Sequence, residues 1–113
     1  MQEYIFSYGT LQTEKVQLEL YGRTLMGSAD ILRNYIISTI EVKDEEFLSK
    51  SEQQVYLIAI TSKDKNDFIK GTVLEITHEE LLLTDKYEPE EYKRVKVILE
   101  SGKNVWIYTA VER

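Results

Sequence analysis

The chain has 113 residues, 42% of them apolar and 30% charged, which is typical of one soluble globular domain spanning residues 1–113. Its formal net charge of −6 speaks against a nucleic-acid partner, because a long polyanion would be repelled on average. Without cysteine the chain has no disulfides, no thiolate metal site and no cysteine nucleophile.

Neither a membrane span nor a targeting segment is expected. No apolar run approaches the ~20 residues needed to cross a bilayer. The first residues, MQEYIFSYG, lack the basic and the sustained apolar segments of a signal peptide. We therefore expect a cytoplasmic protein that does not bind membranes. His78 is the only histidine, and its place at the start of a helix predicts an exposed side chain rather than a metal ligand, so no metal is expected.

The N-terminal part predicts a strand followed by a helix. Tyr4–Tyr8 is β-branched and aromatic, as strands are. A helix is expected over about Gln12–Tyr21, because Val16 and Leu20 are four residues apart and Gly22 is a typical C-terminal stop.

The middle of the chain predicts strands joined by polar connections. The expected strands are Arg23–Leu32, Tyr35–Val42, Val55–Ile60 and Phe68–Ile76. Gly27 suggests a bulge in the first of these strands. The polar segments Lys43–Gln54 and Thr61–Asp67 indicate surface connections.

The second helix has a sharper N-terminal signature in THEELLLTDKYEP. Thr77 can cap the helix while Glu80, three residues later, reaches back as the second half of a capping box. Leu81–Leu83 would supply its buried stripe. Pro89 prevents continuation and favours extended geometry at Glu88, so the helix should end just before that residue.

The C-terminal part of the sequence predicts a β-hairpin. Tyr92–Glu100 and Val105–Val111 alternate in the manner of strands, and SGKN (Ser101–Asn104) between them is a hairpin signal. Trp106 and Tyr108 would share one face of the last strand. Together these elements predict an α+β protein with a small mixed or barrel-like sheet and two helices packed at its side.

The stretch YGTL, at residues 8–11, is the first candidate for function. A strand that passes through Gly9 into a helix start presents backbone N–H groups without intrahelical partners, and such groups favour an anion such as a carboxylate. Gly9 has no side chain to keep a ligand away from the backbone. An ordinary glycine turn would look the same in the sequence.

The second candidate is the acidic segment after the second helix. Asp85, Glu88, Glu90 and Glu91 lie within seven residues, a pattern that also fits a solvated turn. Glu88 differs from the others because it lies at a helix end beside aromatic Tyr87. A carboxyl held against apolar groups has its pKa raised, so Glu88 could exchange a proton near neutral pH. A paired-carboxylate glycosidase lacks support, because no second acid is singled out.

Three blocks of sequence, in a fixed order, cover nearly the whole chain: YIFSYGTL, then GTVLEIT followed by LLLTDKYEPEEYKR, then VWIYTA. Together they resemble the γ-glutamylcyclotransferase-like family, and more closely its small branch of γ-glutamylaminecyclotransferase and AIG2-like proteins. A single block such as YGTL is not specific, whereas the ordered set is.

The resemblance implies a small mixed β-barrel flanked by two or more short helices, and no cofactor. It implies that Glu88 is the catalytic glutamate. The substrate-binding residues that it implies are Tyr8, Gly9, Thr10, Leu11, Tyr92, Arg94 and Tyr108.

The implied reaction cyclises a γ-glutamyl amine or γ-glutamyl amino acid to 5-oxoproline and releases the free amine, with Glu88 as general acid and base. The alternative is a non-catalytic module of the same fold that binds a small carboxylate or a protein. An OB-like oligonucleotide binder would need a basic, aromatic groove, which the sequence does not offer. We expect a monomer or a weak homodimer.

Overall fold

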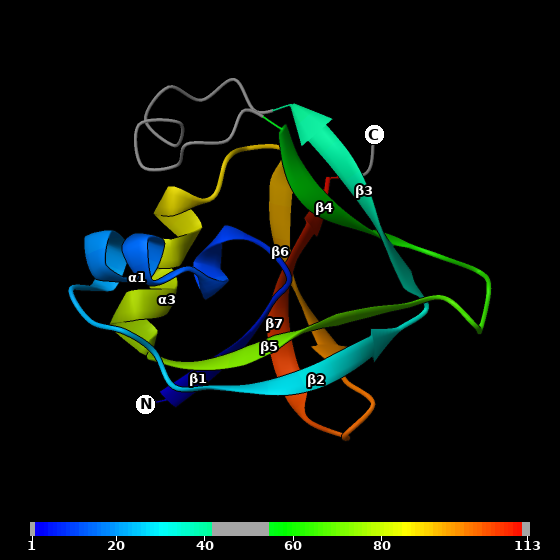
Figure 1. The fold of residues 1–113 in the computed structure, drawn as a ribbon, viewed down its shortest axis with the longest axis horizontal. Coiled ribbons are helices and arrows are strands. Elements are labelled where there is room, and N and C mark those ends of the chain that lie inside the picture. The colour runs from blue at the N-terminus through cyan, green and yellow to red at the C-terminus, as the bar shows by residue number, and fades with distance from the viewer. Residues whose placement is uncertain (1, 42–54, 112–113) are drawn as a thin grey trace.

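The strands of the protein share one curved, mixed sheet, and α1 and α3 lie together at one side of it (Figure 1). The computed structural model describes residues 2–41 and 55–111. The elements are, in order, β1 (Gln2–Ser7), the 3₁₀ helix η1 (Thr10–Gln12), α1 (Glu14–Tyr21), β2 (Gly27–Arg33), β3 (Tyr35–Glu41), β4 (Val55–Thr61), β5 (Phe68–Thr77), α3 (His78–Tyr87), β6 (Tyr92–Ile98) and β7 (Asn104–Ala110). The predicted α+β class is confirmed.

The sheet has the strand order β2-β5-β1-β7-β4-β3, and β6 pairs with β7. Strand β7 runs parallel to β1 and to β4, whereas the other pairs are antiparallel. Among the described residues no ladder joins β6 to β2 or β3, so the sheet is open and not the closed barrel that the resemblance implied. A backbone hydrogen bond of 2.8 Å from Glu100 N to Ile31 O links β2 to the end of β6.

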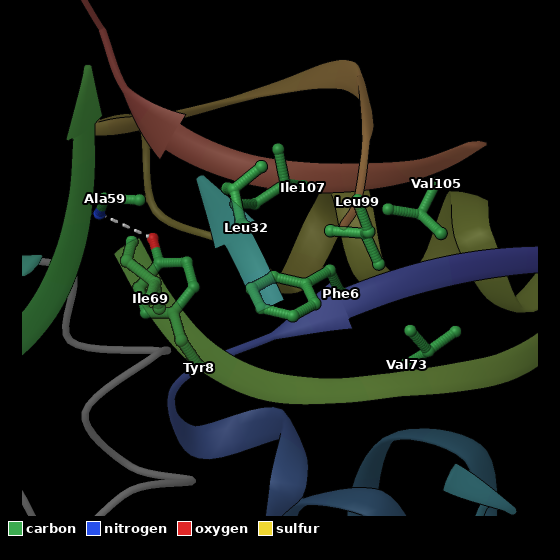
Figure 2. Packing of buried hydrophobic residues seen from close by; sticks show 9 residues of the cluster. All are labelled: Phe6, Tyr8, Leu32, Ala59, Ile69, Val73, Leu99, Val105 and Ile107. Carbon is green, nitrogen blue, oxygen red and sulfur yellow. Dashed lines mark hydrogen bonds between the residues drawn. The ribbon is translucent and has the colours of Figure 1, made fainter. Parts of the chain in front are cut away.

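Two apolar clusters lie on opposite faces of the central strands. Neighbouring residues of β1 separate between them, because successive side chains of a strand point to opposite faces: Ile5 joins one cluster and Phe6 the other. The cluster beneath the helices consists of Ile5, Leu11, Val16, Leu74, Ile76, Leu81, Tyr87 and Tyr108. Figure 2 shows the second cluster, formed by Phe6, Tyr8, Leu32, Ala59, Ile69, Val73, Leu99, Val105 and Ile107.

Helix α3 begins and ends as the sequence predicts. The Thr77 hydroxyl accepts a hydrogen bond from Glu80 N, and the Glu80 carboxylate accepts one from Thr77 N, which completes the capping box. The predicted stripe of three leucines is wrong, because three consecutive residues cover about 200° of a helix surface. Leu81 is buried, whereas Leu82 and Leu83 are 47% and 42% exposed.

Helix α1 begins two residues later than predicted, after the separate turn of η1. It ends as expected at Gly22, whose positive φ of 71° closes the helix in the left-handed conformation. The bulge expected at Gly27 is absent, since Gly27 pairs in unbroken register with Leu74. A Cβ at Gly27 would lie 2.6 Å from Thr72 Cγ2, so this glycine permits close strand contact instead.

The remaining connections fall mostly where the sequence places them. The predicted hairpin joins β6 to β7, and Gly102 adopts the positive φ of 91° at its turn. Residues 62–67 form the expected connection between β4 and β5, one residue shorter than predicted because Thr61 still belongs to β4, and most of them are exposed. The predicted connection Lys43–Gln54 lies outside the described residues. No helix in the described part of the chain has the length and apolar character needed to traverse a bilayer.

Candidate active site

Tyr8 anchors the turn that follows β1 to two other strands. Its buried hydroxyl donates to the Tyr108 carbonyl at 2.5 Å. The same hydroxyl accepts from Ala59 N at 2.9 Å (Figure 2). Burial raises the pKa of this hydroxyl well above its usual value. Because the hydroxyl already has a donor and an acceptor inside the protein, it holds β1, β4 and β7 together at the edge of the candidate site.

The turn itself, residues 9–11, offers backbone on its outer side. A Cβ built at Gly9 would meet nothing within 4 Å, so the space beside this residue is open. Thr10 and Leu11 begin η1, and their N–H groups have no partner within that helix. The Leu11 side chain is buried in the cluster beneath the helices and fixes the turn from below.

Glu88 lies at the end of α3 in the geometry that the sequence predicts. Its φ of −68° and ψ of 133° are extended, and its N–H completes the helix by donating to Thr84 O at 3.0 Å. Pro89, which follows, is fully buried. Burial, together with the negative charge of Asp85, raises the pKa of Glu88 to about 8. The acid is therefore poised to gain and lose a proton near neutral pH.

The structure brings Glu88 and the turn after β1 close together. The Thr10 hydroxyl lies 3.1 Å from the hydroxyl of Tyr87, the residue before Glu88. In addition to burial, the negative charge of Glu88 raises the pKa of Tyr8 and of Tyr108. Glu88 is therefore within electrostatic reach of both β7 and the turn, although the two stretches are about 80 residues apart in the sequence.

Arg94 and Tyr108 converge on one oxygen of Asp85. The Tyr108 hydroxyl donates to Asp85 Oδ1 at 2.7 Å, and Arg94 Nε pairs with the same oxygen at 2.8 Å. The Arg94 guanidinium also lies 4.2 Å from the centre of the Trp106 ring, in a cation–π contact. Burial raises the pKa of the Tyr108 hydroxyl, so it remains protonated.

Tyr92 contributes to the same region through its ring more than through its hydroxyl. The ring packs against the cluster that contains Leu11, Tyr87 and Tyr108. Its hydroxyl donates to Leu57 O, in β4, at 2.7 Å. Of the residues predicted to bind substrate, Tyr8 and Tyr92 thus have hydroxyls engaged with backbone, whereas Gly9 is open.

Two residues beside Glu88 were not singled out by the sequence analysis. Asp85 is three residues before Glu88, a spacing that places both on one face of a helix, and this signal could have identified it. Tyr21, at the end of α1, bonds the Thr84 hydroxyl. Burial raises the pKa of Tyr21 to about 12, and the charge of Glu88 adds to the effect. No sequence pattern indicates that α1 ends beside Glu88.

The described residues contain no group of three or more His, Asp or Glu side chains arranged to hold a metal ion. His78 is exposed at the start of α3, as predicted, and its Nδ1 lies 3.0 Å from a Glu3 carboxylate oxygen.

Solved structures of several proteins share this fold. A protein from Arabidopsis thaliana is 23% identical, with a TM-score of 0.72 over 98% of this chain and 70% of that chain. A structure named gamma-glutamyl cyclotransferase is 17% identical, with a TM-score of 0.71 over 99% of this chain and 68% of its own. An uncharacterized protein from Pyrococcus horikoshii is 18% identical, with a TM-score of 0.64 over 98% and 80% of the two chains.

At these identities the structural likeness establishes the fold alone, and the comparison with curated proteins finds no match. The sequence itself carries more information. Residues 5–113 match the family model described as gamma-glutamyl cyclotransferase, AIG2-like. Because this match covers nearly the whole chain, the protein belongs to the gamma-glutamyl cyclotransferase, AIG2-like family.

Proposed function

We propose that the protein cyclises γ-glutamyl amines or γ-glutamyl amino acids to 5-oxoproline and releases the free amine. The observation that supports the proposal is that Glu88, a carboxyl with a raised pKa, directly follows Tyr87, whose hydroxyl lies 3.1 Å from the Thr10 hydroxyl in the turn of residues 9–11. Membership of the family supports a small-molecule substrate of this class.

In this reaction the α-amine of the γ-glutamyl group attacks its own γ-carbonyl carbon. A new C–N bond closes the five-membered lactam, and the original amide C–N bond breaks as the amine partner leaves. The α-amine begins as an ammonium, which has no free electron pair, so it must first lose a proton. In becoming a lactam N–H this nitrogen loses two protons, one before its attack and one after it. The departing amide nitrogen gains two, one to leave as an amine and one to become an ammonium, so the proton transfers balance within the reaction.

Glu88 has the properties needed to move that proton. A group is most effective in general acid–base catalysis when its pKa lies near the working pH. With a pKa of about 8, Glu88 is present in both protonation states near neutral pH. As a carboxylate it accepts the proton of the ammonium, and as a carboxylic acid it then donates this proton to the leaving nitrogen.

The turn of residues 9–11 supplies the second requirement, which is to hold the substrate in a folded conformation. The N–H groups of Thr10 and Leu11, which lack partners within η1, suit the α-carboxylate, and the space beside Gly9 lets the ligand approach the backbone. Because nucleophile and electrophile belong to one molecule, positioning alone can supply up to ~7–11 kcal/mol of the barrier reduction in favourable cases.

The test is incubation with a panel of γ-glutamyl amines and γ-glutamyl dipeptides, followed by detection of 5-oxoproline. Release from at least one substrate is expected, and Glu88→Gln should lower that rate about 100-fold or more while the protein stays folded. Glu90→Gln is the matched control, because this exposed neighbour loses the same charge without facing the site. Ligand-induced thermal stabilisation without product would instead support a binding module.

A further inference from the structure

Asp85 connects three elements through a single oxygen atom. Its Oδ1 accepts a hydrogen bond from the Tyr108 hydroxyl of β7 at 2.7 Å and forms an ion pair with Arg94 Nε of β6 at 2.8 Å, while its own backbone belongs to α3. The side chains of Asp85 and Arg94 are 32% and 24% exposed, so solvent screens this arrangement only in part.

The bond to Asp85 determines what Tyr108 can do elsewhere. A tyrosine hydroxyl has one proton, and here that proton is directed to Asp85 Oδ1. Towards any other group the hydroxyl can therefore act only as a hydrogen-bond acceptor. A substrate N–H or ammonium group suits such an acceptor, whereas a carboxylate does not.

Asp85 also acts on the neighbouring acid. After burial, its negative charge is the second cause that raises the pKa of Glu88. In the described part of the chain, three hydroxyls that stay neutral at working pH also interact electrostatically with Glu88: Tyr8 after β1, Tyr21 of α1 and Tyr108 of β7. Of the charged groups in residues 2–41 and 55–111, Asp85 is therefore the one that favours the protonated form of Glu88.

We infer that Asp85 is a positioning residue of the site: through its shared Oδ1 it holds the Tyr108 hydroxyl and the Arg94 side chain against α3, three residues before Glu88. The negative charge of Asp85 also acts on the Glu88 carboxyl. The inference deepens the proposed function and rests on it for its catalytic consequence. Its structural part, the effect of Asp85 on Glu88, holds in the protein without substrate.

Two substitutions separate the parts that Asp85 plays. Asp85→Asn retains an oxygen that can accept from Tyr108 and Arg94 but removes the charge. It should shift the Glu88 titration to lower pH by on the order of one unit, while kcat at the pH optimum stays within about threefold of wild type. Asp85→Ala removes both the oxygen and the charge. It should shift the Glu88 titration in the same direction and also lower kcat about tenfold or more relative to wild type.

The Glu88 titration can be followed by ¹³C NMR of the side-chain carboxyl in the wild type, Asp85→Asn and Asp85→Ala proteins. Glu90→Gln again serves as the matched control and should leave the Glu88 midpoint unchanged. The acidic limb of the kcat/KM profile should move to lower pH in Asp85→Asn. If Asp85 served only to stabilise the helix, melting temperatures would fall while the Glu88 midpoint stayed in place.

The inference is overturned if the Glu88 midpoint in Asp85→Asn equals that in Glu90→Gln, or if Asp85→Ala matches Asp85→Asn in kcat. Its failure is distinguishable from that of the proposed function. Absence of 5-oxoproline from every substrate would reject the cyclotransferase activity, whereas the NMR titration in the substrate-free protein decides the effect of Asp85 on Glu88 by itself.

Discussion

The hydroxyl of Thr10 lies 3.1 Å from the hydroxyl of Tyr87, and this contact joins the turn after β1 to the last residue of α3. Glu88 follows Tyr87 directly. The contact therefore fixes the distance between the open backbone of the turn and the acid that we propose as the proton carrier. Two segments from opposite ends of the sequence meet here through a side-chain bond and not through sheet pairing.

Thr10→Val should weaken both the fold and the activity to a small extent. The substitution preserves the shape of the side chain but removes the hydroxyl that meets Tyr87. In a double-mutant cycle with Tyr87→Phe, urea unfolding should give a coupling free energy of about 0.5–1.5 kcal/mol. kcat/KM of the Thr10→Val protein should also fall below that of the wild type, because the turn is no longer tied to Tyr87 and can shift relative to Glu88.

The control for this cycle is Thr39→Val, a change of the same kind at an exposed position of β3. It should not couple to Tyr87→Phe, because Thr39 lies in β3 and Tyr87 at the end of α3. A coupling free energy of zero between Thr10 and Tyr87 would show that the contact does not hold the turn in solution.

Tyr8→Phe should destabilise the protein more than its small change in volume suggests. The hydroxyl serves both Tyr108 O and Ala59 N, and its loss removes a hydrogen-bond partner from two buried backbone groups. The expected loss in the free energy of unfolding is about 1–3 kcal/mol, seen as a melting temperature lower by several degrees.

Tyr4→Phe is the matched control, since Tyr4 lies in β1 and its hydroxyl makes no hydrogen bond to other described residues. It should change the free energy of unfolding by less than about 0.5 kcal/mol. Equal stability of the Tyr8→Phe and Tyr4→Phe proteins would mean that the Tyr8 hydroxyl does not hold the strands together.

Local sequence patterns predicted the helices and strands well, because the start and the end of such an element depend on residues close together in the sequence. The capping box of Thr77 and Glu80, the stop at Gly22 and the end of α3 before Pro89 each depend on residues within one helical turn. Leu82 and Leu83 were placed wrongly, because composition alone does not say which of three consecutive leucines faces the sheet.

The features of the candidate site that the sequence predicted are those that depend on neighbouring residues. The extended backbone of Glu88 follows from the proline after it. The raised pKa of Glu88 was predicted from its position at a helix end beside aromatic Tyr87. The bond between Tyr108 and Asp85 depends instead on the parallel pairing of β1 with β7, at Ile5 and Trp106, which no local pattern encodes. No local pattern encodes the proximity of Tyr21, at the end of α1, to Glu88 either.

Gly9→Ala should leave the fold intact and impair activity. The φ of Gly9 is negative, at −138°, and the added Cβ would meet no atom within 4 Å. The methyl group would instead occupy the space through which we propose that the substrate reaches the backbone. kcat/KM should fall about tenfold or more, with a melting temperature close to that of the wild type.

Gly22→Ala is the contrasting variant. Its φ of 71° disfavours a side chain, so the free energy of unfolding should fall by about 1 kcal/mol, whereas kcat/KM should be unchanged at temperatures where the protein is folded. If Gly9→Ala kept full activity, the backbone beside Gly9 would not be the place where the substrate binds.

Glu88→Gln should make stability less dependent on pH. The pKa of Glu88 is about 8 in the folded protein and near its ordinary value of 4.5 in the unfolded chain. Between these values the folded protein retains a proton that the unfolded chain has released, so the wild type loses stability as pH rises through this window. Glutamine is neutral throughout and is not subject to this loss.

The two proteins should therefore be similarly stable near pH 4, and Glu88→Gln should be more stable at pH 9 by at least about 1 kcal/mol. Urea unfolding at intervals across this range measures the difference, and Glu90→Gln should follow the wild-type curve. A constant difference between wild type and Glu88→Gln at all pH values would mean that the carboxyl titrates normally. In that case Glu88 would be fully ionised at neutral pH, and it would lack the protonated form that the leaving amine requires.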